Sequence, residues 1–308
     1  MLDSTWLESA ESAARASMEA SMLAQIAGRP GFRSLMKPWV QTWQVRGDDS
    51  AMLARTLRDV GRFLTGVWAI QLHATPGGLT LSRLADLLKR SGFSGPGRAR
   101  SILIFLRFIG YIETAPGGGD GRARQFAPTA RMLAAFRSRV LRDLNVFWPV
   151  APAILAVGRH LDRDEVLKAY IAGIGEVTGV AFEAYRPGGP TLDVISQRYG
   201  GMAVLAELIL STPQDRTFPP EGPLPVTLAG LARTCHTTRP QVRATLAAAE
   251  TSGFIVLSPD GRYRLTEQLT QHLDMLLAGT LVVVGYAARR ALAVATAEDA
   301  LDPRTKFV

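Results

Sequence analysis

The chain has 308 residues, of which 47% are hydrophobic and 20% are charged, and its formal net charge is +8. This composition is typical of a globular protein of about two domains, and it excludes a disordered chain and a fibrous repeat. The lone cysteine, Cys235, excludes an intramolecular disulfide, and neither it nor the four histidines have the spacing of metal ligands. We therefore expect no metal site, and no motif in the chain predicts a cofactor or an enzyme.

Residues 1–50 are predicted to form an N-terminal helical extension. The chain begins with the acidic stretch Met1-Leu-Asp-Ser-Thr-Trp-Leu-Glu, which has no apolar core, so we do not expect a secretory signal. A cytoplasmic protein is the expectation that follows.

Residues 51–145, here called the first repeat, are predicted to form two helices, a tight turn, a third helix, two strands around a glycine-bearing loop, and a final helix. In the third helix, apolar residues recur at the spacing of one buried helix face: Ala99, Ile102, Leu103, Leu106 and Ile109. Gly110 stands where a helix C-cap glycine belongs. The loop at 115–124 leads into a strand-like segment and not into a helix, so a phosphate-binding loop is not favoured.

Residues 190–288, the second repeat, follow the same order of elements. Leu84-Ala85 corresponds to Leu231-Ala232 and Gly110 corresponds to Gly253, with length changes only in turns, where they are tolerated. The third helix of this repeat is predicted to bury three residues and to expose three others: Val242, Leu246 and Ala249 inward, Arg243, Ala247 and Glu250 outward. Thr238 and Gln241 have capping-box spacing, and an Asp-Gly hairpin follows at 258–264.

The remaining segments are predicted to connect the two repeats or to follow the second one. Residues 146–189 are predicted to be a helical connector and residues 289–308 a C-terminal tail. The apolar stretch 275–288 is short for a membrane span and is broken by Arg289, so we interpret it as a buried or dimerising helix, with a membrane segment as the weaker alternative.

This order of elements is that of a winged helix-turn-helix, and both repeats resemble the MarR-type group of bacterial transcription regulators. Members usually carry one such domain and form homodimers through terminal helices. Two copies in one chain suggest a single-chain pseudo-dimer. The resemblance implies a fold that is mostly α with small β wings, with two winged helix-turn-helix domains in a pseudo-two-fold arrangement joined by helices.

The positive charge belongs to the first repeat, which has 15 Lys and Arg against 5 Asp and Glu, a net of +10. The second repeat has 7 against 8, a net of −1. Cations release counterions from DNA phosphates, and arginine commonly reads guanine in the major groove. We therefore expect double-stranded DNA as the partner, a nucleoid-associated location, and a dominant contact by the first repeat.

The predicted DNA-contacting residues lie on the exposed faces of the two third helices and on the two wings. They are Arg98, Arg100, Ser101, Ile104, Arg107, Arg122 and Arg124 in the first repeat, and Thr238, Arg239, Gln241, Arg243, Arg262 and Arg264 in the second.

Alternatives stay open at this point. The arginines can be solvated helix faces or solubilising loops, and the second repeat can serve pairing instead of DNA contact. Instead of a transcription regulator, the chain can be a replication initiator or a chromosome-associated tandem winged-helix interaction protein. The tryptophans predict core packing or else a pocket for a small apolar effector, and a homodimer is a further option.

Overall fold

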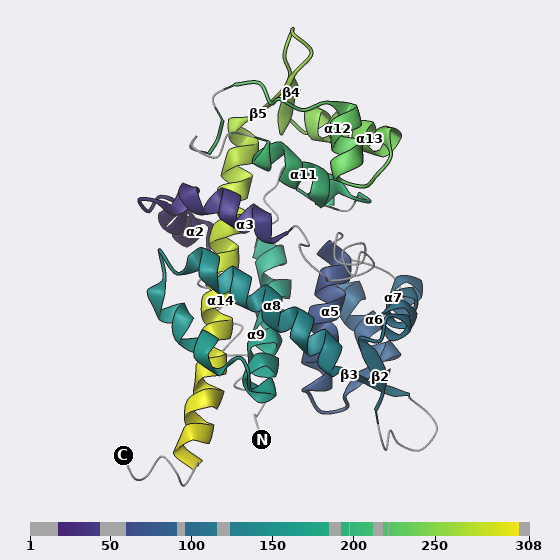
Figure 1. Ribbon diagram of the computed structural model, residues 1–308, viewed down its shortest axis with the longest axis vertical. Coiled ribbons are helices and arrows are strands. Elements are labelled where there is room, and N and C mark those ends of the chain that lie inside the picture. The colour runs from purple at the N-terminus through teal and green to yellow at the C-terminus, as the bar shows by residue number, and fades with distance from the viewer. Residues whose placement is uncertain are drawn as a thin grey trace. The chain divides into compact units, whose positions relative to one another are not determined.

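The computed structural model describes residues 18–43, 60–90, 96–115, 124–184, 192–196, 198–211, 218–220 and 222–301. They are mostly helical, with two small antiparallel sheets, as the sequence predicts (Figure 1). The chain divides into two compact units, each of which joins segments that are distant in sequence. One unit takes in Leu64–Glu183 and the chain from Leu281, and the other takes in Glu19–Phe63 and Ala184–Thr280.

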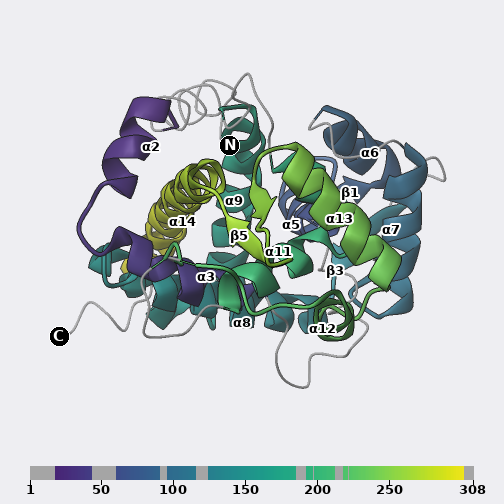
Figure 2. The same ribbon diagram turned by 90° about the horizontal axis from the view of Figure 1, so that it is seen from above.

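The first repeat forms the greater part of one unit. Its elements, in chain order, are α5 (Val60–His73), β1 (Leu79–Thr80), α6 (Leu81–Arg90), α7 (Pro96–Phe108), β2 (Ile112–Thr114), β3 (Gln125–Pro128) and α8 (Ala130–Phe147). The strands form an antiparallel sheet in the order β1-β3-β2, with Leu79 opposite Phe126 and Glu113 opposite Ala127. Helices α6 and α7 pack against each other beside this sheet (Figure 2).

The predicted connector is mostly helical over its described residues, 146–184, and completes the core of this unit. After α8 come η2 (Pro152–His160) and α9 (Asp164–Ala184). Trp68 of α5 is fully buried and its indole N–H donates to the Gly175 carbonyl of α9 at 3.3 Å. A Cβ added to Gly173 would lie 3.0 Å from the Ala287 Cα, so these small residues allow the two helices to cross closely.

The second unit contains the second repeat and part of the predicted N-terminal extension. The extension supplies α2 (Ala20–Ala27), η1 (Phe32–Leu35) and α3 (Met36–Thr42). The repeat supplies α10 (Asp193–Ser196), α11 (Gly201–Leu210), α12 (Leu228–Thr234), α13 (Arg239–Thr251), β4 (Ile255–Leu257), β5 (Tyr263–Leu265) and the first part of α14 (Glu267–Leu301). Strands β4 and β5 pair antiparallel, with Val256 opposite Arg264.

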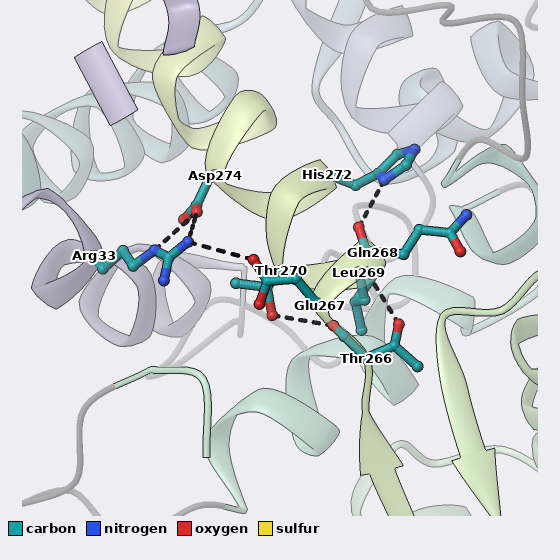
Figure 3. Close-up of polar contacts among 8 residues, drawn as sticks. All are labelled: Arg33, Thr266, Glu267, Gln268, Leu269, Thr270, His272 and Asp274. Atoms are coloured by element: carbon teal, nitrogen blue, oxygen red, sulfur yellow. Dashed lines mark hydrogen bonds and ion pairs between the residues drawn. The ribbon is translucent and has the colours of Figure 1, made fainter. Parts of the chain in front are cut away.

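Arg33 attaches the extension to α14 through ion pairs with Asp274 and, at 3.9 Å, with Glu267 (Figure 3). The Arg33 guanidinium of η1 donates to the Asp274 carboxylate at 2.9 and 2.7 Å, and Asp274 is only 6% exposed. Burial raises the pKa of this carboxyl, and the bond and charge of Arg33 oppose that rise. Asp274 is therefore a buried carboxyl whose described partner, Arg33, comes from a segment far away in sequence.

The two repeats end their third helix with the same hydrogen bonds. Gly110 and Gly253 both have φ +73°, and each lies in a Schellman turn after its helix. The hydroxyls of Thr129 and Thr266 donate to the carbonyls of these two glycines, at 2.7 Å in both cases. Each hydroxyl also accepts from the backbone N–H three residues later, at 3.4 and 3.2 Å, and so caps the next helix.

The start of the second helix of each repeat is matched as well. Thr80 accepts a hydrogen bond from the backbone N–H of Arg83 at 3.3 Å, and Thr227 accepts one from the N–H of Gly230 at 3.0 Å. Both threonines precede their helix by one residue, so the same kind of cap fixes where α6 and α12 begin.

Three features differ from the prediction. The first sheet has a third strand, β1, which pairs with β3. In the described part of the second repeat no strand takes this place, although the Leu224 backbone N–H donates to the Tyr263 carbonyl of β5 at 2.7 Å. Helix α14 continues to Leu301, through the expected boundary at residue 289, because Ala287, Ala291 and Ala295 keep a buried small-residue face. From Glu19 onward, the described part of the extension clusters with the second repeat.

By length and composition alone, α14 is apolar enough over Glu267–Ala297 to cross a membrane, and 39% of its most apolar window is buried. It also carries three ion pairs to other elements: Asp274 and Glu267 each pair with Arg33 of η1, and Arg290 pairs with Glu176 of α9. Charged residues that pair with neighbouring helices fit a core helix of a helical protein. These contacts favour the interpretation as a buried helix.

Candidate nucleic-acid interface

Helix α7 has one buried and one exposed face, as the sequence predicts. The five apolar residues expected to be buried are all buried, at most 7% exposed: Ala99, Ile102, Leu103, Leu106 and Ile109. Gly97, Arg100, Ser101, Ile104 and Arg107 are exposed on the other side. The helix has no acidic residue, so its exposed face is positive.

The side chains on this face are available to a partner to different degrees. Among the described contacts, the side chains of Arg100 and Arg107 make no hydrogen bond or ion pair, so both guanidinium groups are free to bind an anion. Ser101 donates its hydroxyl proton to the Gly97 carbonyl at 3.0 Å, and its oxygen can still accept. The side chain of Arg98 lies outside the described residues.

Much of the charge of the first repeat is used inside the protein. Four arginines bind its own groups: Arg83 the Gly78 carbonyl at 2.6 Å, Arg131 the Ile109 carbonyl at 2.8 Å, Arg137 the Asp164 carboxylate at 2.8 Å, and Arg139 the Asp143 carboxylate at 3.0 Å. Arg131 also lies over the Tyr111 ring at 5.6 Å. The net charge of +10 therefore overstates the charge that faces outward, and Arg100 and Arg107 become the stronger candidates.

The wing of the first repeat is described only at its two ends. Arg124 is exposed just before β3 and makes no described polar contact. Arg122 lies outside the described residues, so its predicted contact stays a prediction.

Helix α13 begins with the predicted capping box. Thr238 Oγ1 accepts from the Gln241 N–H at 3.4 Å, and Gln241 Oε1 accepts from the Thr238 N–H at 3.2 Å. The Gln241 oxygen also accepts from the hydroxyl of Thr237 at 2.6 Å. The Thr238 hydroxyl donates to the same Gln241 oxygen at 3.0 Å, so both predicted DNA-contacting side chains are engaged in the cap and only the Gln241 amide N–H₂ is left to donate.

The other predicted residues of the second repeat are exposed. The side chains of Arg239 and Arg243 on α13, and of Arg264 on β5, make no hydrogen bond or ion pair in the part of the chain that the structure describes. Arg262 lies on the hairpin turn, 3.9 Å from the Asp260 carboxylate, which reduces its positive field.

The matched Schellman turns allow α7 and α13 to be compared position by position. Counting back from Gly110 and Gly253, Arg100 corresponds to Arg243, and Arg107 corresponds to Glu250. One exposed cation is therefore shared by the two helices, and the other is replaced by an acid in the second repeat. The exposed faces of α7 and α13 therefore differ in charge at this position.

Phe108 is a feature of the face that sequence reasoning missed. Its side chain is 77% exposed, and Ile104, one turn earlier, is 60% exposed. The helical spacing of four residues from Ile104 was the available signal, because it puts Phe108 beside Ile104 on one side of the helix.

Among the described residues, no group of three or more His, Cys, Asp or Glu side chains is placed to hold a metal ion. Comparisons with protein-family models, with curated proteins and with solved structures find no match to this chain.

Proposed function

We propose that the chain is a sequence-specific, double-stranded DNA-binding transcription regulator built from two winged helix-turn-helix domains in a pseudo-two-fold arrangement. The observation that carries the proposal is α7, an acid-free helix that presents Arg100 and Arg107, free of described partners, opposite its buried face. Such a helix beside a small antiparallel sheet suits the major groove, where arginine reads guanine and its neighbours bind phosphates.

The assignment of two domains is supported by the shared caps. Thr129 and Thr266 make equivalent bonds after equivalent Schellman turns, and Thr80 and Thr227 cap equivalent helices. Two copies of one domain would keep such equivalent hydrogen bonds even after most of their side chains have changed.

The first repeat is proposed to make the dominant contact. Its third helix carries two exposed cations where α13 carries Arg243 and Glu250. An acid at the DNA surface repels phosphate, so α13 gains less from the same approach.

The test of DNA binding is selection followed by a salt titration. Full-length protein is mixed with random duplexes and with genomic fragments, the bound DNA is sequenced, and affinity is measured by fluorescence anisotropy at several salt concentrations. We expect a discrete enriched sequence whose log affinity falls linearly with log salt.

The sequences recovered also separate the kinds of DNA protein. Promoter sites support a transcription regulator, whereas an array of origin repeats supports a replication initiator. Recovery of no enriched sequence, together with binding that does not respond to salt, would contradict the proposal.

A further inference from the structure

We propose that Ile104 and Phe108 form an apolar pair that reads the 5-methyl groups of thymine, so that α7 selects A·T pairs on one side of the base pair read by Arg100. This inference rests on the proposed function and adds to it the base type that the helix prefers. It starts from the unusual exposure of the two side chains, 60% for Ile104 and 77% for Phe108.

The pair shares one side of α7 with the free cations. Positions 100, 104, 107 and 108 are spaced by four, three and one residues, so all four side chains leave the helix within one broad face. A large apolar side chain left in water forgoes a considerable gain from burial, so an external surface is expected to cover it.

The charge around the pair indicates which surface that is. Arg100 and Arg107 flank Ile104 on either side along the helix, and α7 has no acidic residue. A polyanion with apolar groups inside a groove is complementary to such a face. Duplex DNA has this combination, because its phosphates line the groove and the thymine methyl projects into it.

The spacing fits bases that are near neighbours. Four helical residues span about 6 Å along the axis, and base pairs are stacked about 3.4 Å apart. When α7 lies along the groove, Ile104 and Phe108 therefore meet methyl groups about two base pairs apart. Arg100, four residues before Ile104, reaches a guanine at a similar distance on the other side.

The second repeat lacks the pair and so provides an internal control. Ala247 and Thr251 stand at the positions of Ile104 and Phe108, and both are exposed. Neither offers a comparable apolar surface, so the preference for thymine methyls is confined to the half of the site that α7 contacts.

The experiment removes single methyl groups from the DNA. In the selected duplex each thymine is replaced in turn by deoxyuridine, which keeps base pairing and lacks only the methyl, and the affinity of the full-length protein is measured by anisotropy. We expect a loss of about fourfold at two positions, the size of one buried methyl group.

The variants assign the two positions to side chains. Phe108→Ala should abolish the deoxyuridine effect at one position and Ile104→Ala at the other, while Thr251→Ala leaves both effects intact. Both side chains are exposed, so the fold should persist, which circular dichroism checks.

Several results overturn the inference. If deoxyuridine has no effect at any position while Arg100→Ala still weakens binding, the pair does not read thymine and the proposed function stands. If Phe108→Ala changes the mass in light scattering and leaves the deoxyuridine effects intact, the pair is a contact between two copies of the chain. If no duplex is bound in a salt-dependent way, the proposed function fails and the inference fails with it.

Discussion

Asp274 is the buried titratable residue whose environment has the clearest consequence for stability. Burial raises its pKa in the folded protein, so the folded state holds the proton more tightly than the unfolded chain does. Unfolding then releases the proton, and the contribution of Asp274 to the free energy of unfolding falls as pH rises from its ordinary pKa through the raised one.

We therefore expect the stability of the native chain relative to Asp274→Asn to fall as pH rises through this interval. Urea unfolding of both proteins at steps between about pH 4 and pH 7 measures the difference. Arg33→Met removes the opposing charge and should make the fall steeper. A difference that grows with pH would show that the ion pair outweighs burial.

His236 is the residue with the least favourable backbone among those described. It has φ +48° in the turn between α12 and α13. The backbone N–H groups of His236 and Thr237 donate to the carbonyls of Arg233 and Ala232, which is the hydrogen-bond pattern of a Schellman turn. His236→Gly should relieve part of the roughly 1–2 kcal/mol cost of the left-handed conformation, offset by about 0.4–1 kcal/mol of unfolded-chain entropy. The net expectation is a small rise in stability in urea unfolding.

Gly253→Ala makes the opposite change to His236→Gly, because it places a Cβ on a residue with positive φ. Its φ is +73° and the added Cβ would lie 2.7 Å from the Gln268 side-chain oxygen. We expect a loss of more than about 1 kcal/mol. Equal stability of this variant and the native chain would contradict the turn geometry.

At the scale of elements, we expect the helix caps of Thr129 and Thr266 to contribute equally to the free energy of unfolding. Thr129→Ala and Thr266→Ala should each lower the free energy of unfolding by about 1 kcal/mol, because each removes a cap and a bond to the preceding turn. Thr296→Ala is the control, since this exposed threonine bonds only within α14 and alanine suits a helix interior better. A loss at only one of the two caps would contradict their equivalence.

The sequence predicted the elements that depend on local pattern. The 3.6-residue spacing located the buried face of α7, and the Thr238 to Gln241 spacing predicted the capping box of α13. These features depend on residues within one or two turns of each other, so a single sequence is enough to find them.

What escaped prediction depends on contacts between distant segments. Strand β1 has only two residues and exists through pairing with β3, and Arg33 meets its partner 241 residues away. In the candidate site, counting charge could not reveal that Arg83 and Arg131 bind the protein's own carbonyls. Only the structure separates arginines that hold the fold from those left to a partner.

At the scale of the whole molecule, the proposed function predicts an asymmetric DNA site, because α7 and α13 differ in their exposed residues. With both helices on one face of the duplex, half-sites would lie about 34 Å apart, one helical turn. Sequencing of the selected DNA checks this. A perfect palindrome bound by a dimer of chains would show that the second repeat serves pairing.

The charge reversal between α7 and α13 gives a gain-of-binding prediction. Glu250→Arg gives α13 the pattern of α7, and we expect tighter binding with a salt slope steeper by about one unit, near one per added phosphate contact. Arg124→Ala on the first wing should do the reverse and weaken all sequences similarly. Anisotropy at several salt concentrations measures both, and an unchanged slope in the two variants would place these residues away from DNA.

The central claim, that the protein reads DNA and does so mainly through its first repeat, is tested most directly by the matched pair Arg100→Ala and Arg243→Ala. The two arginines stand at equivalent positions and both are exposed, so their loss should not disturb the fold. The account predicts that Arg100→Ala costs about 1–3 kcal/mol of binding free energy on the selected duplex and relaxes the preference at one base pair, while Arg243→Ala costs clearly less. Equal losses from the two changes, or no loss from Arg100→Ala, would contradict it.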